Sequence, residues 1–235
     1  MIAPRPEPPK QKVTLERVYV WQVPVRVTHW VLFFSIVVLS ATGYYMGRPY
    51  IDVPGAAKDH FVMGTMIAVH NYAAVFFTLA VIARLYWFFV GNRYARLSEF
   101  IPVSKQRLRS LWESFLYYSF IRHDPTHYAV HNALAGAIYA MLFVVYILLI
   151  VTGVVLYAVD TTIGAPIRVF EYLAPLLGGL PMTRLLHHLG MWIILIFAVV
   201  HIYTVLLSSL IEHVGTFDSI FSGYKFMPVR KADKP

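Results

Sequence analysis

Two histidines in one strongly apolar stretch are the residues of this chain that could do chemistry. The stretch runs from Leu185 to Tyr203, is long enough to cross a membrane, and contains His187 and His201. Ionisable side chains inside a bilayer are costly, so they indicate a functional site. The two histidines are fourteen residues apart, which is about 1400° of helix and within about 40° of four full turns. Both imidazoles therefore lie on one face of the predicted helix.

The same spacing separates the two imidazoles in depth. Fourteen residues of helix rise about 21 Å, so one His lies near each side of a hydrocarbon core about 30 Å thick. His188 falls outside this register, and we do not expect it to be a ligand. Two histidines on one face at different depths suit two stacked haems, each of which needs one further His from another helix.

The composition indicates a membrane protein. Of the 235 residues, 58% are hydrophobic and 14% are charged, and the mean hydropathy is +0.61. The chain has no cysteine, which excludes a Cys-ligated iron–sulfur cluster, a CxxCH haem attachment and a disulfide. His or Met must therefore hold any redox cofactor. The net charge of +8 could suggest nucleic acid, but the distribution of charges indicates membrane topology, and no nucleic-acid partner is expected.

The apolar segments predict an all-α, integral membrane four-helix bundle. The expected spans cover residues 25–46, 61–90, 128–158 and 184–210. They form one domain, 19–211, between a flexible tail at 1–18 and a C-terminal tail at 212–235. A short amphipathic helix on the membrane surface is expected near residues 105–116, between the second and third spans. Arg84, near the end of the second span, is expected to extend to the membrane surface. The sequence shows no internal repeat.

Lys and Arg residues predict the orientation of the bundle. Five lie at the N-terminal end, six in the loop between the second and third spans, and four in the C-terminal tail, against two in each remaining loop. Because positively charged loops remain in the cytoplasm, both termini and the long middle loop are expected there. The apolar loop 159–181 then lies outside, where its apolar residues indicate either a helix at the membrane interface or a contact with a partner protein.

Depth predicts which histidines pair. His29 enters the first span from the cytoplasm, and His70 begins the second span from the outside. We therefore expect His70 to pair with His187 at the outer level, and His29 with His201 at the cytoplasmic level. Gly43 lies fourteen residues beyond His29 on the same face. Its missing side chain would let the outer porphyrin approach the backbone.

Other interpretations of the histidines remain open. A single His in a span can simply form a hydrogen bond to a neighbouring helix. Zinc would need ligands that converge on one point, and a proton relay would need Asp or Glu inside the spans to continue it. His131, at the start of the third span, could contact a haem propionate or a quinone, or could be a hydrated interfacial residue. A haem-free membrane scaffold or small transporter is an alternative of a different class.

Several motifs together resemble one protein family. They are VYVWQVPVRVTHW, MGTMIAVHNY, ARLYWFFVGNRYAR, HNALAGA, HHLGMW with HIY, and SIFSGYKF. This set resembles the b-type cytochrome subunit of membrane-bound nickel–iron uptake hydrogenases over about residues 18–226. GNRYAR and SGYKF are more specific to that family than the His spacing, which formate dehydrogenase cytochrome subunits share. The segment SSLIEHVG lacks an acidic run usual in relatives, and HNA stands where His-Asn-Pro is usual.

The resemblance implies an electron-transfer subunit in the bacterial inner membrane. Such a chain would anchor the small (iron–sulfur) and large (nickel–iron) hydrogenase subunits on the outer face, within a larger symmetric oligomer. It would pass electrons through two b haems to a quinone in the membrane lipid, without activating hydrogen itself. His29, His70, His187 and His201 would be the axial ligands of the haem irons. The alternative is the cytochrome b subunit of a formate dehydrogenase or a related respiratory dehydrogenase.

Overall fold

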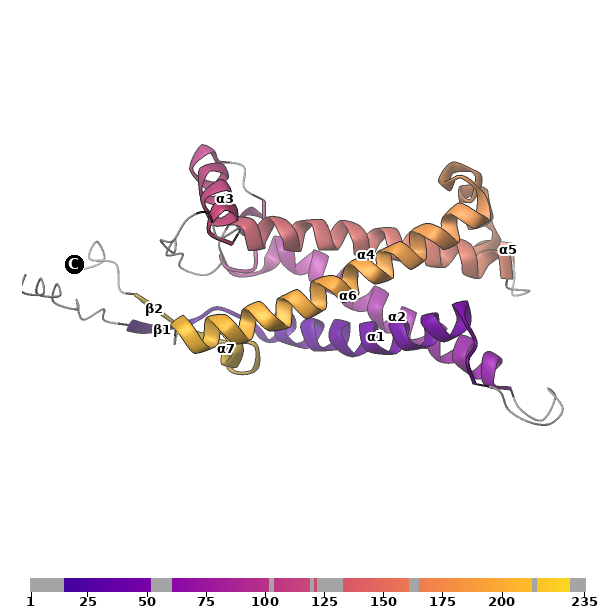
Figure 1. Cartoon of the computed structure of the whole chain (residues 1–235), viewed down its shortest axis with the longest axis horizontal. Coiled ribbons are helices and arrows are strands. Elements are labelled where there is room, and N and C mark those ends of the chain that lie inside the picture. The colour runs from indigo at the N-terminus through magenta and orange to yellow at the C-terminus, as the bar shows by residue number, and fades with distance from the viewer. Residues whose placement is uncertain are drawn as a thin grey trace, which may run out of the picture.

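Four long helices form the body of the protein and run along its longest axis (Figure 1). The computed structural model describes residues 15–51, 61–101, 104–118, 121, 133–160, 165–212 and 215–228. The long helices are α1 (Val23–Gly47), α2 (Val62–Val90), α4 (Ala133–Asp160) and α6 (Gly179–Glu212). All four are long and apolar enough to cross a membrane, since about 20 apolar residues span the hydrocarbon core. The predicted all-α, multi-pass membrane fold is confirmed.

The four helices are arranged as two helical hairpins. Helix α1 packs along α2, and α4 packs along α6, whereas backbone contacts between the hairpins are few. Gly190 of α6 permits a close approach within the second hairpin, because a Cβ there would lie only 2.9 Å from Cδ2 of Leu149 on α4. A single buried cluster joins the two hairpins, and its members include Leu32, Phe77, Val81, Leu142, Tyr146 and Ile194.

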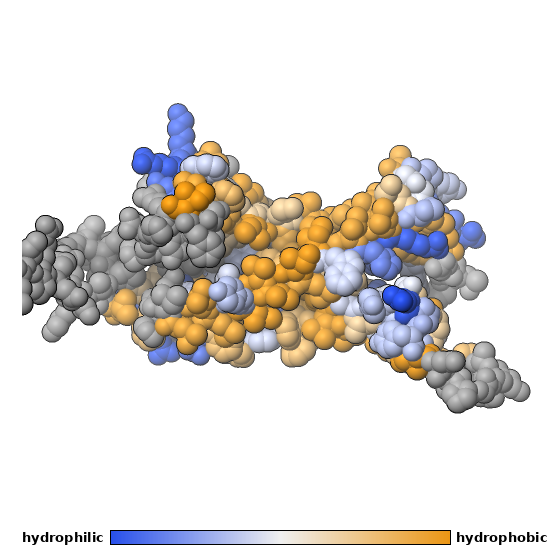
Figure 2. All heavy atoms as spheres, in the orientation of Figure 1, coloured by the Kyte–Doolittle hydropathy of each residue, from blue (hydrophilic) through white to orange (hydrophobic). Residues whose placement is uncertain are grey.

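The outer surface of the bundle is apolar. Phe76, Leu79 and Val199 have exposed fractions of 60%, 58% and 70%. Figure 2 shows hydrophobic side chains gathered along the helices and hydrophilic ones towards the two ends. Such a band would be unfavourable in water, but lipid chains solvate it at no cost, while the backbone hydrogen bonds are satisfied inside each helix. The surface therefore fits a bilayer.

Short elements lie at the two ends of the bundle. At one end, α3 (Lys105–Tyr118) is the predicted amphipathic helix, and it runs across the direction of α4 (Figure 1). The 3-10 turn η2 (Leu97–Glu99) precedes it. At the other end, the connection between α4 and α6 contains α5 (Ala165–Arg168), η3 (Val169–Leu173) and η4 (Pro175–Leu177). We call residues 165–177 the α5–η4 segment.

The two ends of the described chain pair with each other. Strand β1 (Leu15–Tyr19) is antiparallel to β2 (Tyr224–Pro228), and helix α7 (Thr216–Ser222) precedes β2. Gly223 joins α7 to β2 with a φ of 87°, and its carbonyl accepts the backbone N–H of Val20 at 2.8 Å and of Trp21 at 3.0 Å. Both ends of the described chain therefore lie at the same end of the bundle (Figure 1).

Gln22 connects these paired ends to helix α2. Its Oε1 atom accepts hydrogen bonds from Nε1 of Trp87 and from the backbone N–H of Asn92, both at 2.9 Å. The Asn92 side chain donates to the Val20 carbonyl at 3.0 Å. The GNRYAR and SGYKF motifs thus both contact residues 20–22. We call β1, residues 20–22, residues 91–96, α7 and β2 the terminal cap.

The structure differs from the sequence expectations in four places. Residues 15–18, expected in a flexible tail, belong to β1, and the expected C-terminal tail contains α7 and β2. Helix α6 begins at Gly179, ahead of the expected residue 184. The expectation for Arg84 is wrong, because this residue is only 7% exposed. Its guanidinium lies 4.2 Å from the centre of the Phe88 ring and donates to the Ala95 carbonyl at 3.4 Å. The Phe88 ring and the Ala95 carbonyl thus stabilise this charge.

Candidate haem sites

The structure brings four histidines together as two separate pairs. His70 of α2 faces His187 of α6, with ring centres 6.4 Å apart and an interplanar angle of 57°. His29 of α1 faces His201 of α6, also at 6.4 Å, with an angle of 53°. We call these the 70/187 pair and the 29/201 pair. Helix α6 contributes one member to each, because its two histidines share a face, and α1 and α2 of the other hairpin supply the partners.

The 70/187 pair is held from behind by two threonines. Nδ1 of His70 lies 2.9 Å from Oγ1 of Thr42 on α1. Nδ1 of His187 lies 2.8 Å from Oγ1 of Thr152 on α4. Each threonine belongs to the same hairpin as the histidine that it contacts. The hydrogen bond occupies the Nδ1 side of each ring and leaves Nε2 available for a metal.

Aromatic rings surround the 29/201 pair. Phe197 stacks on His201 with ring centres 5.4 Å apart and an angle of 15°. The Tyr139 hydroxyl lies 3.3 Å from Nδ1 of His201, and Trp30 meets His29 edge to face at 5.3 Å. Nδ1 of His29 is buried without a hydrogen-bond partner in the part of the chain that the structure describes. This pair is therefore packed by aromatic rings but is less firmly hydrogen-bonded than the 70/187 pair.

The geometry fits two haems. Two imidazoles that each place a nitrogen about 2 Å from one metal ion have ring centres about 6 Å apart, and both pairs match this spacing. Among the described residues, no group of three or more His, Cys, Asp or Glu side chains could hold a metal. A pair of imidazoles suits an ion whose other four bonds come from a macrocycle, as in haem.

The remaining predicted residues have the following positions. Gly43 lies against His70, and a Cβ there would come within 3.3 Å of Cε1 of that ring. Its absent side chain thus makes room for an imidazole. His188 is in neither pair: its Nδ1 bonds the Arg184 carbonyl at 3.0 Å, and its ring lies against Gly47. His131 lies outside the described residues.

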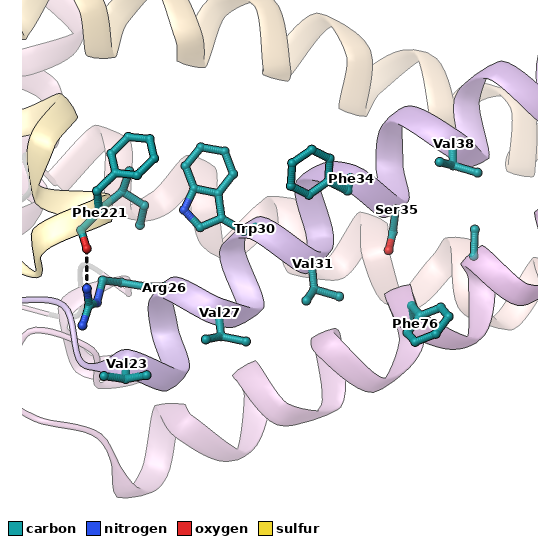
Figure 3. A pocket seen from close by; sticks show the side chains of 12 residues that line it. Val23, Arg26, Val27, Trp30, Val31, Phe34, Ser35, Val38, Phe76 and Phe221 are labelled. Atoms are coloured by element: carbon teal, nitrogen blue, oxygen red, sulfur yellow. Dashed lines mark hydrogen bonds between the residues drawn. The ribbon is translucent and has the colours of Figure 1, made fainter.

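An open, apolar groove of about 700 Å³ lies between α1, α2 and α7. Figure 3 shows Trp30, Phe34 and Phe76 lining it, and Arg26 donating a hydrogen bond to the Phe221 carbonyl at one end. None of the four paired histidines lines it. The groove adjoins the 29/201 pair through Trp30, which meets His29 edge to face, and its apolar lining suits lipid chains.

Sequence comparison identifies the family. A family model described as prokaryotic cytochrome b561 matches residues 20–223, which include all four long helices and all four paired histidines. The chain belongs to the prokaryotic cytochrome b561 family. Membership makes this chain a multi-pass membrane cytochrome that binds haem b.

Three relatives share about a third of their residues with this b561-family chain. A protein of Cupriavidus necator is 33% identical over 90% of the chain and 88% of the relative. One of Azotobacter vinelandii is 34% identical over 93% and 91%. Both are named probable Ni/Fe-hydrogenase B-type cytochrome subunit. A protein of Escherichia coli K12, named probable Ni/Fe-hydrogenase 1 B-type cytochrome subunit, is 33% identical over 88% and 90%.

The threonine contacts are the site feature that sequence reasoning missed. Thr42 and Thr152 are each followed by a glycine, and this repeated Thr-Gly pair is the only sequence signal that could have drawn attention to them. A threonine inside a span usually bonds its own helix backbone, so its type alone does not predict a contact with histidine.

Proposed function

We propose that this chain carries electrons from a nickel–iron hydrogenase on the outer face of the bacterial inner membrane to the quinone pool, through two b-type haems. In this proposal the 70/187 pair holds the outer haem and the 29/201 pair holds the cytoplasmic one. Each haem, when bound, supplies a one-electron iron couple whose potential the protein sets. The observation that carries the proposal is the pair of facing imidazoles at each of two levels, 6.4 Å between ring centres.

The chain's own residues would determine the position and the insulation of the two haems. Helix α6 fixes both levels at once, because its histidines are fourteen residues apart and rise about 21 Å. Phe197 stacks on the ring of His201 and Tyr139 meets it edge to face, so both cover part of that ring. Keeping water away from a haem ligand favours electron transfer over side reactions and contributes to the reduction potential of the haem.

The partners in this proposal are the hydrogenase small and large subunits. The names of the three relatives support a hydrogenase partner. The chain itself has no cysteine, so iron–sulfur clusters that feed electrons to it must belong to a partner. We place the docking surface on the α5–η4 segment, where Tyr172 and Leu176 are 79% and 81% exposed. A larger symmetric oligomer of the whole complex is part of the same proposal.

The orientation supports quinone reduction from the cytoplasmic side. The terminal cap holds both ends of the described chain at one end of the bundle, and the excess of Lys and Arg at the termini predicts that this end is cytoplasmic. Protons for the quinone would then come from the cytoplasm, while hydrogen oxidation releases protons outside. Turnover would build a membrane potential. His131 is the proposed quinone or propionate contact, because imidazole carries protons near neutral pH.

Haem counting in single variants tests the ligands. His187→Ala and His201→Ala should each lower the haem content by about half, and their spectra should differ because each removes a different haem. His188→Ala is the matched control and should retain both haems, since its ring belongs to neither pair. Pyridine haemochrome assays of the purified complex measure the content. If His187→Ala and His201→Ala both retain two haems, the assignment of these histidines as haem ligands is wrong.

Activity with two acceptors tests the quinone site. In the intact complex, His131→Ala should slow hydrogen-to-quinone turnover, while hydrogen-to-dye turnover and haem content persist. If the substitution changes neither the hydrogen-to-quinone nor the hydrogen-to-dye turnover, the quinone site lies elsewhere. If the catalytic subunit that copurifies with the chain lacked nickel, the donor would instead be a formate dehydrogenase or a related respiratory dehydrogenase.

A further inference from the structure

The two hairpins repeat one contact. In the first hairpin, Thr42 of α1 bonds His70 of α2 at 2.9 Å. In the second, Thr152 of α4 bonds His187 of α6 at 2.8 Å. The two bonds have nearly the same length, join the same two atoms, and lie behind the two rings of one pair. Four independent helices thus place the same chemical arrangement on both sides of a single haem site.

The direction of each hydrogen bond follows from a second contact. Oγ1 of Thr42 donates to the Val38 carbonyl at 2.7 Å, and Oγ1 of Thr152 donates to the Leu148 carbonyl at 2.7 Å. A hydroxyl has only one hydrogen. Because that hydrogen is directed to a carbonyl, which can only accept, the oxygen must accept from the imidazole. The Nδ1 atoms of both histidines therefore carry hydrogen, and both Nε2 atoms present a lone pair.

A glycine makes a second contact with each ring, and we call the threonine and the glycine together the Thr-Gly seat of that ring. Gly43 follows Thr42, and a Cβ on it would lie 3.3 Å from Cε1 of His70. Gly153 follows Thr152, and a Cβ on it would lie 3.2 Å from Cε1 of His187. Each imidazole is thus held by a hydrogen bond at one atom and by close packing against a backbone at the next. Two contacts on adjacent ring atoms fix the rotation of the ring.

The other pair lacks this seat, although the same helices pass it. His29 lies thirteen residues before Thr42, and Tyr139 lies thirteen residues before Thr152. At these equivalent positions, α1 therefore has His29, a proposed haem ligand, and α4 has Tyr139, with its aromatic hydroxyl. The Tyr139 hydroxyl lies 3.3 Å from His201, and Nδ1 of His29 is a buried atom without a partner among the described residues. Among the described residues, the Thr-Gly seats serve one haem level only.

We propose that Thr42 and Thr152 are positioning residues that fix the Nδ1–H tautomer and the orientation of His70 and His187, and thereby lower the potential of the haem at that level. This proposal rests on the ligand assignment of the proposed function. A hydrogen bond from Nδ1–H to an acceptor makes the imidazole a stronger electron donor, which favours ferric iron. With both ligands so held, the two haems would differ in potential through hydroxyls that contact the histidine ligands.

Substitutions of nearly equal shape test the hydroxyls in the purified complex. Thr42→Val and Thr152→Val remove the acceptor while keeping a branched side chain, and Thr42→Ser and Thr152→Ser restore it. A redox titration followed in the visible spectrum should show that the midpoint potential of one haem shifts upward in each Val variant, more in the double variant, and returns in the Ser variants. The potential of the other haem should stay unchanged. Thr78→Val is the matched control, because Thr78 makes the same backbone bond, to Ala74 at 2.7 Å, in α2.

Haem content separates the possible failures. Unchanged potentials of both haems in the Val variants, with two haems retained, would overturn the proposal. Loss of haem that the Ser variants do not rescue would also overturn it, because the threonines would then act by packing alone. If His70→Ala and His187→Ala both retain two haems, the ligand assignment itself fails, and the proposed function fails with it.

Discussion

At the scale of single residues, a polar ring on one apolar helix is held by a threonine of the neighbouring helix. A buried imidazole needs a partner for its second nitrogen, and the interior of a membrane offers little besides neighbouring helices. The threonines meet this need because their own hydrogen is already directed to a carbonyl one turn earlier. The result is a neutral acceptor that adds no charge to the bilayer interior.

Gly43→Val should weaken haem binding at the 70/187 level. A Cβ at this position would lie 3.3 Å from Cε1 of His70, and the two methyl groups of valine need still more space, so the ring has to rotate away from its threonine. We expect haem binding to weaken about tenfold or more, measured as haem content after detergent dilution. Ala41→Val, at an exposed position of α1, is the control. Full haem retention in Gly43→Val would show that the ring does not depend on this packing.

Much of the histidine arrangement could be predicted from the sequence, and the reasons are geometric. Helical periodicity puts His187 and His201 on one face, and depth sorts His29 and His70 between them; the structure brings the same residues together. The seats could not be predicted, because only the hairpin contact shows that Thr42 faces His70. Arg84 was misjudged because the sequence does not reveal that Phe88 and Ala95 cover it.

At the scale of elements, the terminal cap depends on one backbone conformation. Gly223 has a φ of 87°, which a residue with a side chain adopts at a cost of about 1–2 kcal/mol. A Cβ there would also lie 2.5 Å from Cε2 of Tyr19. The turn between α7 and β2 therefore requires glycine, and the strand pairing depends on that turn.

Gly223→Ala should open the terminal cap without affecting the haems. A cost of about 1–2 kcal/mol corresponds to about tenfold faster hydrogen exchange at the amides of Val20 and Trp21, which bond to the Gly223 carbonyl. Gly64→Ala is the control, because the atom nearest to the added Cβ would be the Cβ of Phe61, at an ordinary contact distance of 3.9 Å. Unchanged exchange in Gly223→Ala would mean that the turn does not hold the cap together.

At the scale of the whole molecule, the two ends of the bundle have different surfaces. One end carries the paired strands, α7 and α3, and the other carries the α5–η4 segment (Figure 1). The chain has no cysteine, so a single introduced thiol reports on one end alone. Phe217 of α7 is 42% exposed and Tyr172 of η3 is 79% exposed, which makes them suitable positions.

Tyr172→Cys should react with a membrane-impermeant maleimide added from outside, and a short crosslinker on it should trap the iron–sulfur subunit in the assembled complex. Phe217→Cys should react only after the membrane is opened. The physical reason is that the Lys and Arg distribution predicts cytoplasmic termini. The reverse labelling pattern would invert the proposed topology and place the partner at the terminal cap.

The pairing of β1 with β2 also has a consequence for the order of assembly. Strand β1 finds its partner only after all four long helices have been synthesised, since Leu15 lies opposite Pro228. Until then β1 presents an unpaired edge, which is open to unwanted pairing. The hydrogen bonds that Trp87 and Asn92 donate to Gln22 need only the first hairpin and the residues just after it, so they can form early and hold β1 in place. The terminal cap thus forms in two stages, first the hydrogen bonds to Gln22 and then the pairing of β1 with β2. The second stage requires that α6 has already crossed the membrane.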